Sequence, residues 1–532
     1  MLDNKTDALP QHQPELPTRP QLPMPKSDQV YFAEEQKGWH GYVEWEKYPD
    51  KAKRAAEILS QHKFAGVPEF QLKPLSSTNP RLEGVRWKQY HAALGPTLEN
   101  LPNESWDIVK EEKAEDMIHV LDFPYNGEPP RDRLVGTTLT RNEDHFVRNH
   151  GGIPVIDENE YCLDIGGMVN NPTRLTLKDL KNENLFPRQT AVVTIQCSGT
   201  RRIEQIQEYP GDGDELINAP WGEGAIGTAR WTGVSLKKVL KHCGGLKEGA
   251  GHIEFMGVDT YFKKGQVYNY VVSVPWRKVR VHEVMLAWEM NGKPLPKIHG
   301  YPLRAVVFGY IGARSVKWLA RITAIPHPST APVQKKEYLY YTPQAGKHNA
   351  SYSSGFSIQD MPVASAIISP IDKAVIIHDG AIKMRGWAYS GGGHWPERVE
   401  VSGDGGSVWY ETPYEKLSQK YFHAWRLWEI DLPVDAEGWL ELVARCWDNA
   451  LNTQPTYVRS TWNWDLHVTS SCHRIKVFSV NRSRPATAKR LKRLEQEGID
   501  FHPVTKPLEI DLESDDEYET EMQRRGGREP EE

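Results

Sequence analysis

The sequence predicts an α+β protein in which a mixed domain precedes an antiparallel β-sandwich. Between Phe146 and Pro326, short β-rich runs such as AVVTIQC and HIEFMGV alternate with short helical runs such as TLKDLKN. This alternation is typical of a mixed α+β domain. After Lys336 the apolar residues alternate with period two, in runs separated by turn signals such as GDGG. The second pattern indicates an antiparallel β-sandwich between about Val363 and Val480.

The chain has 532 residues, which is more than one ordinary core accommodates, so we expect two or three domains with terminal extensions. Residues 1–30 are rich in proline and polar residues, which predicts disorder, and the composition of Asp50–Lys63 predicts a helix. The expected divisions are a partly disordered N-terminal extension over 1–130, the mixed domain over 131–330, a linker over 331–362, the sandwich over 363–482 and a charged, disordered tail over 483–532.

The mixed domain is expected to alternate strands with helices. Strands are predicted at AVVTIQC, HIEFMGV, YNYVVSV and LRAVVFGYIG, and helices at TLKDLKN, SLKKVLKHCGG and VHEVMLAWEMNG. The pairs Gly244-Gly245 and Asn291-Gly292 are expected to end two of these helices. In the sandwich, strands are predicted at KMRGWAYS, ERVEVSGDGG, WRLWEIDL, LELVARCWD and TWNWDLHV, and the basic run ATAKRLKRLEQEG is expected to be helical.

Composition excludes several functional classes. The formal net charge is -6 and no long basic stripe occurs, so a nucleic acid is not an expected partner. No apolar run approaches the length of a membrane helix. The five cysteines are odd in number and lack CxxC spacing, which argues against a disulfide framework and a structural zinc site. The N-terminal residues have no apolar or Arg-rich targeting pattern, so we expect a cytoplasmic protein; the mitochondrial intermembrane space and the peroxisome stay open.

Cys197 is the first candidate for chemistry, because it ends the predicted strand AVVTIQC and is followed by Ser-Gly-Thr-Arg-Arg. A thiol at a strand end beside two guanidiniums is electrostatically favoured as the thiolate. Gly199 permits close approach of the backbone, and paired arginines suit an anion. The alternative is a buried structural cysteine, which is the commoner role of an isolated cysteine.

The cysteine loop resembles that of the sulfite oxidase family, in which the pattern is Cys-Ala-Gly-Asn-Arg-Arg. Other segments resemble the family in the same chain order, and together they cover about residues 146–480. These segments are FVRNH, GTARWTGVSL, MNGKPLPKIHGYPLR with GARSVKWL, IQDMPVASAI, GWAYSGGG and AWRLWEIDL.

The resemblance implies that the first domain binds a molybdenum-molybdopterin cofactor and that the second is an immunoglobulin-like dimerisation sandwich, so a homodimer is expected. Cys197 would be the metal ligand, because a thiolate is a suitable soft donor for this metal. No haem is expected in this chain, since no His-Pro-Gly-Gly segment occurs. The residues that match the family's cofactor contacts are Phe146, Val147, Arg148, Asn149, His150, Cys197, Asp259, His299, Arg304, Ser315, Val316 and Lys317.

The implied reaction is oxidation of sulfite to sulfate by oxygen-atom transfer, with electrons passed to dioxygen or to an external carrier protein. Arg148, Arg202 and Arg426 match the arginines that bind the oxyanion, a role that suits guanidinium groups. Trp221 and Tyr270 match the aromatic wall, and Tyr270 would donate a hydrogen bond or take part in proton movement. The alternative for Arg426 is a cross-strand ion pair or a guanidinium stacked on Trp425 or Trp428.

Three departures from the family pattern leave the substrate open. Ser198 and Thr200 replace Ala and Asn in the cysteine loop, and Ser315 stands where animal sulfite oxidases have His. A nitrate-reductase-like activity, or action on another oxyanion or an S-oxide, is therefore the first alternative. An alternative of another class is a cofactor-free binding protein with an immunoglobulin-like domain.

Overall fold

The computed structural model describes residues 104–121, 124–154, 156–208, 219–263, 266–346, 349–498 and 501. The predictions of disorder over 1–30 and of a helix over Asp50–Lys63 lie outside these residues. Within them, α+β architecture followed by a sandwich is confirmed.

The first domain consists of two five-stranded sheets and one three-stranded sheet. Their strand orders are β11-β10-β7-β6 with β12 on β10, then β5-β4-β13-β8-β9, and β1-β2-β3. In chain order its elements are α5 (Glu104–Glu112), β1 (Ile118–Leu121), β2 (Asn126–Glu128), α6 (Arg131–Leu134), β3 (Val147–Arg148), β4 (Cys162–Gly167), β5 (Thr173–Thr176), α7 (Leu177–Leu180), β6 (Arg188–Gln196), α8 (Arg202–Glu208), β7 (Ile226–Ser235), α9 (Leu236–His242), β8 (His252–Lys263), β9 (Gln266–Pro275), α10 (Trp276–Arg280), β10 (Val284–Met290), β11 (Lys293–Pro294), the 3-10 helix η4 (Lys297–His299), β12 (Arg304–Val307), the 3-10 helix η5 (Gly312–Arg314) and β13 (Leu319–Ile325).

One predicted helix is a strand. The run VHEVMLAWEMNG forms β10, which pairs with β7, β11 and β12 and is buried on both faces except at Glu289. A strand covered on both faces reads as a continuous apolar run, which its sequence does not distinguish from a buried helix. Asn291 and Gly292 both have positive φ, 54° and 75°, and they make the two-residue turn of the β10–β11 hairpin rather than a helix end.

The N-terminal boundary of the first domain lies earlier than the sequence predicts. Residues 104–128 were expected to belong to an extension, yet they form α5, β1 and β2, and β2 pairs with β3. The register places Asn126 opposite Arg148 and Gly127 opposite Val147. The segment therefore supports the strand that carries the FVRNH motif.

The region between the domains also has regular structure. It contains α11 (Pro332–Lys335) and the paired strands β14 (Leu339–Tyr340) and β15 (Phe356–Ser357). Leu339 and Tyr341 belong to a small core cluster with Trp464. The segment expected to be a linker, residues 331–362, thus packs against the loop of the sandwich domain that contains Trp464.

The sandwich domain pairs a three-stranded sheet, β16-β18-β21, with a five-stranded sheet, β17-β23-β22-β19-β20. All its strand pairs are antiparallel except β17 with β23. Its elements are β16 (Ala364–Ser369), β17 (Val375–His378), β18 (Ala381–Tyr389), β19 (Pro396–Ser402), β20 (Tyr410–Glu411), the 3-10 helix η6 (Tyr414–Lys416), β21 (Arg426–Pro433), β22 (Gly438–Asp448), the 3-10 helix η7 (Val458–Ser460) and β23 (His473–Asn481), followed by α12 (Pro485–Glu497).

The strand predicted at TWNWDLHV does not form. Leu466 and Val468 have positive φ, and the side-chain amide of Asn463 donates to the carbonyl of His467. These residues make an irregular loop between η7 and β23, because a strand requires negative φ throughout. The loop returns to the first domain, where the N–H of Val468 donates to the carbonyl of Ser198 (2.6 Å).

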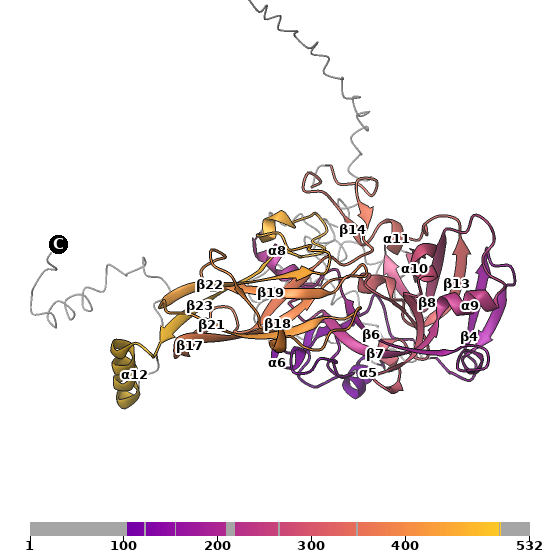
Figure 1. Ribbon diagram of the computed structural model, residues 1–532. Helices are drawn as coiled ribbons and strands as arrows, with labels where there is room; N and C mark the ends of the chain where they lie inside the picture. The colour runs from indigo at the N-terminus through magenta and orange to yellow at the C-terminus, as the bar shows by residue number, and fades with distance from the viewer. Residues whose placement is uncertain are drawn as a thin grey trace, which may run out of the picture.

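The two domains lie side by side, with α6 and α8 at their junction and α12 at the far end of the sandwich (Figure 1). The largest hydrophobic cluster runs through this junction, from β-strand residues of the first domain to Trp387, Tyr389 and Trp425. The five cysteines form no disulfide, as expected. Among the helices that the structure describes, none combines the length and apolarity needed to cross a bilayer.

Candidate functional site

A pocket in the first domain brings together segments that are far apart in the sequence. It lies among β3, the end of β6, β8, η4 and the segment that follows η5. All twelve residues predicted to contact a cofactor line it, which are Phe146, Val147, Arg148, Asn149, His150, Cys197, Asp259, His299, Arg304, Ser315, Val316 and Lys317. His145, Ile195, Tyr270, Gly312, Ala313 and Tyr338 complete the wall.

The loop that carries Cys197 is a tight, internally bonded turn at the end of β6. The N–H of Cys197 donates to the carbonyl of Ala225 (2.9 Å), and the Thr200 hydroxyl donates to that carbonyl and to the carbonyl of Cys197 (both 2.8 Å). The N–H of Gly199 donates to Sγ of Cys197 (3.3 Å). The loop therefore fixes Sγ of Cys197 at the wall of the pocket, where it is placed as a ligand.

The pocket is surrounded by buried cations whose hydrogen bonds go to uncharged groups. Arg304 donates to the carbonyls of residues 299, 305 and 315, and Lys317 donates to Oδ1 of Asn149 and to a carbonyl. Arg202 donates to the carbonyls of residues 219 and 466 and to His467. Burial lowers the pKa of Arg304 to about 9 and that of Arg202 to about 10. Buried charges of one sign require a counter-charge, so the pocket suits an anionic ligand.

Polar atoms without a protein partner also face this region. In the part of the chain that the structure describes, Nδ2 of Asn149, Oδ1 of Asp259 and Nε2 of His145 are buried and make no hydrogen bond. Burial raises the pKa of Asp259, and Lys317 opposes this shift. Such groups are costly unless a ligand pairs with them. A bound molecule with polar edges would supply the missing partners.

Lys113 extends the site to the N-terminal segment. It follows α5, and its ammonium group lies 3.2 Å from Nε2 of His299 and donates to the carbonyls of Asn142 and His145. Burial lowers the pKa of Lys113 to about 7, with nearby carboxylates opposing the shift. Taken together, a soft thiolate, several buried cations and unpaired polar groups fit a molybdenum-pterin cofactor with its phosphate.

The residues predicted to bind substrate are only partly brought together. Arg148 and Tyr270 line the pocket, and the Tyr270 ring lies 4.6 Å from that of His150. The Tyr270 hydroxyl donates to the carbonyl of Ala313 (2.8 Å). Trp221 is fully buried and is absent from the lining, and the centroid of its ring lies 6.3 Å from that of Phe146. Trp221 therefore supports the wall rather than facing the pocket.

Arg426 requires a correction, since the structure does not place it at this pocket. It begins β21, where it pairs with Ala388 of β18. Its Nε donates to the carbonyl of Ser418 (3.0 Å), and its guanidinium lies 5.0 Å from the Tyr414 ring. The side chain is buried within the sandwich, as the alternative expected, but its ring partner is Tyr414 rather than Trp425 or Trp428. An anion-binding role for Arg426 does not fit this position.

Two residues that the sequence did not single out lie at the pocket or directly behind its wall. Tyr338 lines the pocket, and its hydroxyl lies 2.6 Å from Nε2 of His150. His467 stacks on Tyr338 with ring centroids 5.5 Å apart and contacts Arg202. Tyr338 falls in the predicted linker and His467 in a predicted strand. The tyrosine-rich run YLYY was the available signal for the first; nothing in the local pattern marked the second.

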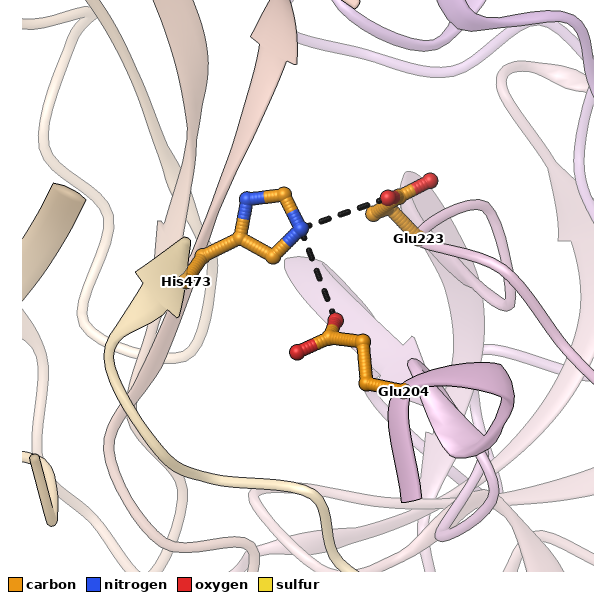
Figure 2. Close-up of side chains that lie close together, drawn as sticks. All are labelled: Glu204, Glu223 and His473. Carbon is orange, nitrogen blue, oxygen red and sulfur yellow. Dashed lines mark ion pairs between the residues drawn. The ribbon is translucent and has the colours of Figure 1, made fainter. Parts of the chain in front are cut away.

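A separate group of side chains at the domain junction has the spacing of metal ligands. Figure 2 shows Nε2 of His473 between the carboxylates of Glu204 and Glu223, at 3.4 and 3.3 Å. However, the N–H of Ile367 donates to Nδ1 of His473 (2.9 Å), so the ring proton lies on Nε2. A metal would need the Nε2 lone pair. Arg201 pairs with Glu204 besides, so we interpret the group as an interdomain hydrogen-bond network.

Comparison with known proteins agrees with this geometry. The family model of the oxidoreductase molybdopterin binding domain matches residues 150–333, and that of the Mo-co oxidoreductase dimerisation domain matches residues 355–480. The crystal structure of the sulfane dehydrogenase SoxCD from Paracoccus pantotrophus is similar with a TM-score of 0.56 and 25% identity, over 68% of this chain and 86% of that one. The fold and site therefore define a molybdopterin oxidoreductase.

Similar proteins of known name identify the family within the molybdopterin oxidoreductases. The chain is 38% identical to the mitochondrial sulfite oxidase of Homo sapiens over 67% of its own length and 64% of that protein. It is 35% identical to the sulfite oxidase of Arabidopsis thaliana over 66% of its own length and 91% of that protein. The chain belongs to the sulfite oxidase family, which confirms the resemblance seen in the sequence.

Proposed function

We propose that this chain oxidises sulfite to sulfate with a molybdenum-molybdopterin cofactor. The observation that carries the proposal is the pocket at Cys197, which the buried Arg304 and the half-buried Lys317 line. Arg202 is buried beside the cysteine loop, and all three cations are bonded to uncharged groups. These cations serve two anions in this proposal, the cofactor phosphate and the substrate. When bound, the cofactor supplies the oxygen-atom transfer and takes up two electrons.

The side chains of this pocket bind and orient the substrate. Arg148 and Arg202 are close enough for the charge of Arg148 to contribute to the lowered pKa of Arg202. Two guanidiniums in a buried site bind an oxyanion through charge-assisted hydrogen bonds of fixed direction. The Tyr338 hydroxyl and Nε2 of His150 lie 2.6 Å apart, within hydrogen-bond distance, so this pair can hold a proton beside the anion.

Several finer features belong to the same proposal. Electrons leave to dioxygen or to an external carrier, no haem is bound by this chain, and two copies associate through the sandwich domain. The cytoplasm is the proposed compartment. Reduction of nitrate, or action on another oxyanion or an S-oxide, is the alternative reaction on this scaffold. The observation that favours it is the departure of Ser198, Thr200 and Ser315 from the residues of the family pattern.

An acceptor screen tests the proposed reaction. Protein from a host that makes the cofactor is expected to contain stoichiometric molybdenum and to oxidise sulfite with ferricyanide, cytochrome c or dioxygen as acceptor. Metal content, sulfite-dependent acceptor reduction and nitrate-dependent oxidation of a reduced dye are measured on the same sample. Molybdenum without sulfite turnover would contradict the proposed substrate, and faster nitrate turnover would favour the alternative. Absence of molybdenum would contradict the cofactor assignment.

A second prediction concerns Gly199, which packs closely against the guanidinium of Arg202. A Cβ built on Gly199 would lie 2.7 Å from the guanidinium carbon and both terminal nitrogens of Arg202. Because three hydrogen bonds fix Arg202, Gly199→Ala is expected to displace the guanidinium and raise the KM for sulfite on the order of 10-fold. Steady-state kinetics at constant molybdenum content measure the effect. Gly166→Ala is a control for handling and expression, since nothing lies within 4 Å of its Cβ and its φ is not positive. An unchanged KM in Gly199→Ala would contradict the close packing.

A further inference from the structure

His467 comes from the sandwich domain but lies among groups of the first domain. It is 4% exposed and belongs to the irregular loop before β23. Its Nδ1 lies 3.1 Å from Nη2 of Arg202 and 3.0 Å from Oγ of Ser198, which adjoins Cys197. Its ring stacks on Tyr338, whose side chain lines the pocket. The loop therefore places a residue of the sandwich domain directly behind the pocket wall at Tyr338.

The direction of the contact with Arg202 follows from the chemistry of the two groups. A guanidinium only donates hydrogen bonds, so Nδ1 of His467 accepts from Arg202 and the ring proton lies on Nε2. Burial, followed by the charges of Arg202, Arg148 and Arg314, lowers the pKa of His467 well below its usual value. The imidazole is therefore a neutral acceptor between three arginines.

This acceptor completes the fixation of Arg202. The guanidinium donates from Nε to the carbonyl of Leu466 (2.9 Å) and from Nη1 to the carbonyl of Ala219 (2.7 Å). With the bond to His467, three of its five N–H groups are used, and two remain for an anion. Two of the three acceptors, Leu466 and His467, belong to the sandwich loop. Gly199 closes the opposite face.

His467 also contacts the pocket wall by stacking on Tyr338. The ring planes of the two side chains are inclined by 27°, so the imidazole covers the tyrosine ring. The Tyr338 hydroxyl is the group that contacts His150. His467 thus contacts both the guanidinium of Arg202 and the phenol ring of Tyr338, which the proposed function places beside the substrate.

We propose that His467 is a positioning residue of the oxyanion site, which holds Arg202 and Tyr338 in place from the sandwich domain and thereby sets the affinity and selectivity for the anion. The inference rests on the proposed function, because it assigns a role in binding the substrate proposed above. It also replaces Arg426 as the residue through which the sandwich contributes to the site.

The test separates the acceptor atom of His467 from its bulk. His467→Asn places Oδ1 near the position of Nδ1 and can accept from Arg202, whereas His467→Leu cannot. His467→Leu is expected to raise the KM for sulfite about 10-fold or more with a smaller change in kcat, while His467→Asn stays within about 3-fold of the natural protein. His378→Leu is the matched control, since His378 is a buried, hydrogen-bonded histidine elsewhere in the sandwich.

Sulfate binding to the holoenzyme, measured by calorimetry, gives a readout that does not depend on turnover. His467→Leu is expected to weaken sulfate about 10-fold at unchanged molybdenum content. Unchanged KM and sulfate affinity in His467→Leu, equal losses in the Asn and Leu variants, or no sulfate binding by the natural protein would overturn the inference. If the natural protein binds sulfate and His467→Leu weakens it, but sulfite is not oxidised, the proposed reaction fails and the positioning role stands.

Discussion

Replacing Cys197 by serine is expected to lower sulfite turnover by at least about 10³-fold while the protein stays folded. Changes to groups that only support a metal ligand cost about 10- to 100-fold, so loss of the ligand itself should exceed them. Serine is close to cysteine in size and its hydroxyl can accept from the N–H of Gly199, which donates to Sγ of Cys197. The other hydrogen bonds of the loop run through backbone atoms and Thr200. The loss therefore reflects the change from a soft sulfur to a hard oxygen donor.

The measurement combines turnover with molybdenum content, pterin content and the thermal unfolding midpoint. Pterin content is expected to fall less than activity, because Arg304, His299 and Lys317 still line the pocket. Cys162→Ser is the matched control, since Cys162 lies on β4 outside the pocket and is only half-buried. A Cys197→Ser protein that kept more than about a tenth of the natural turnover would refute the assignment of Cys197 as the ligand.

The pocket shows which parts of the site were open to prediction from the sequence. Residues near Cys197, Asp259 and His299 sit in motifs whose order along the chain follows the sulfite oxidase family, so the resemblance named them. It could not name Tyr338 or His467. These two reach the pocket through packing between domains, and no local periodicity records a contact between Arg202 and a residue more than 260 positions away.

The errors have local physical causes. The run that forms β10 is apolar on both faces, so its period does not separate a strand from a buried helix. Arg426 was assigned by resemblance to a family motif, but it begins β21 of the sandwich and donates to the carbonyl of Ser418 there. The loop before β23 resembles a strand in composition, and its two positive-φ residues, Leu466 and Val468, are not glycines that would have marked it.

The two consecutive arginines of the cysteine loop illustrate how the domains and the site depend on each other. Arg201 has φ of 65°, which turns its side chain away from that of Arg202. Arg202 donates to the carbonyls of Ala219 and Leu466 and to His467. Arg201 donates to the carbonyls of Ser365 (3.0 Å) and Ser471 (2.7 Å) in the sandwich. Both arginines thus join the loop that presents Cys197 to the sandwich domain, one through the loop before β23 and the other through Ser365 and Ser471.

Arg201→Met is accordingly expected to destabilise the protein by about 3–5 kcal/mol, because removing one partner of a buried ion pair leaves the other uncompensated. Arg201 pairs with both oxygens of Glu204 at 2.6 and 2.7 Å, and its side chain is fully buried. Without Arg201, Glu204 loses both of its contacts with the guanidinium beside His473, whereas Glu223 keeps its ion pair with Arg131. The urea unfolding midpoint of the holoenzyme measures the loss.

Two further variants distinguish this mechanism from a general loss of contacts. Arg174→Met removes the exposed ion pair with Asp164 and is expected to cost at most about 1 kcal/mol. The double variant Arg201→Met with Glu204→Gln removes the buried charge as well as its partner, so it should be more stable than Arg201→Met alone. A double variant that is less stable would show that packing of the Arg201 side chain, rather than compensation of charge, joins the cysteine loop to the sandwich.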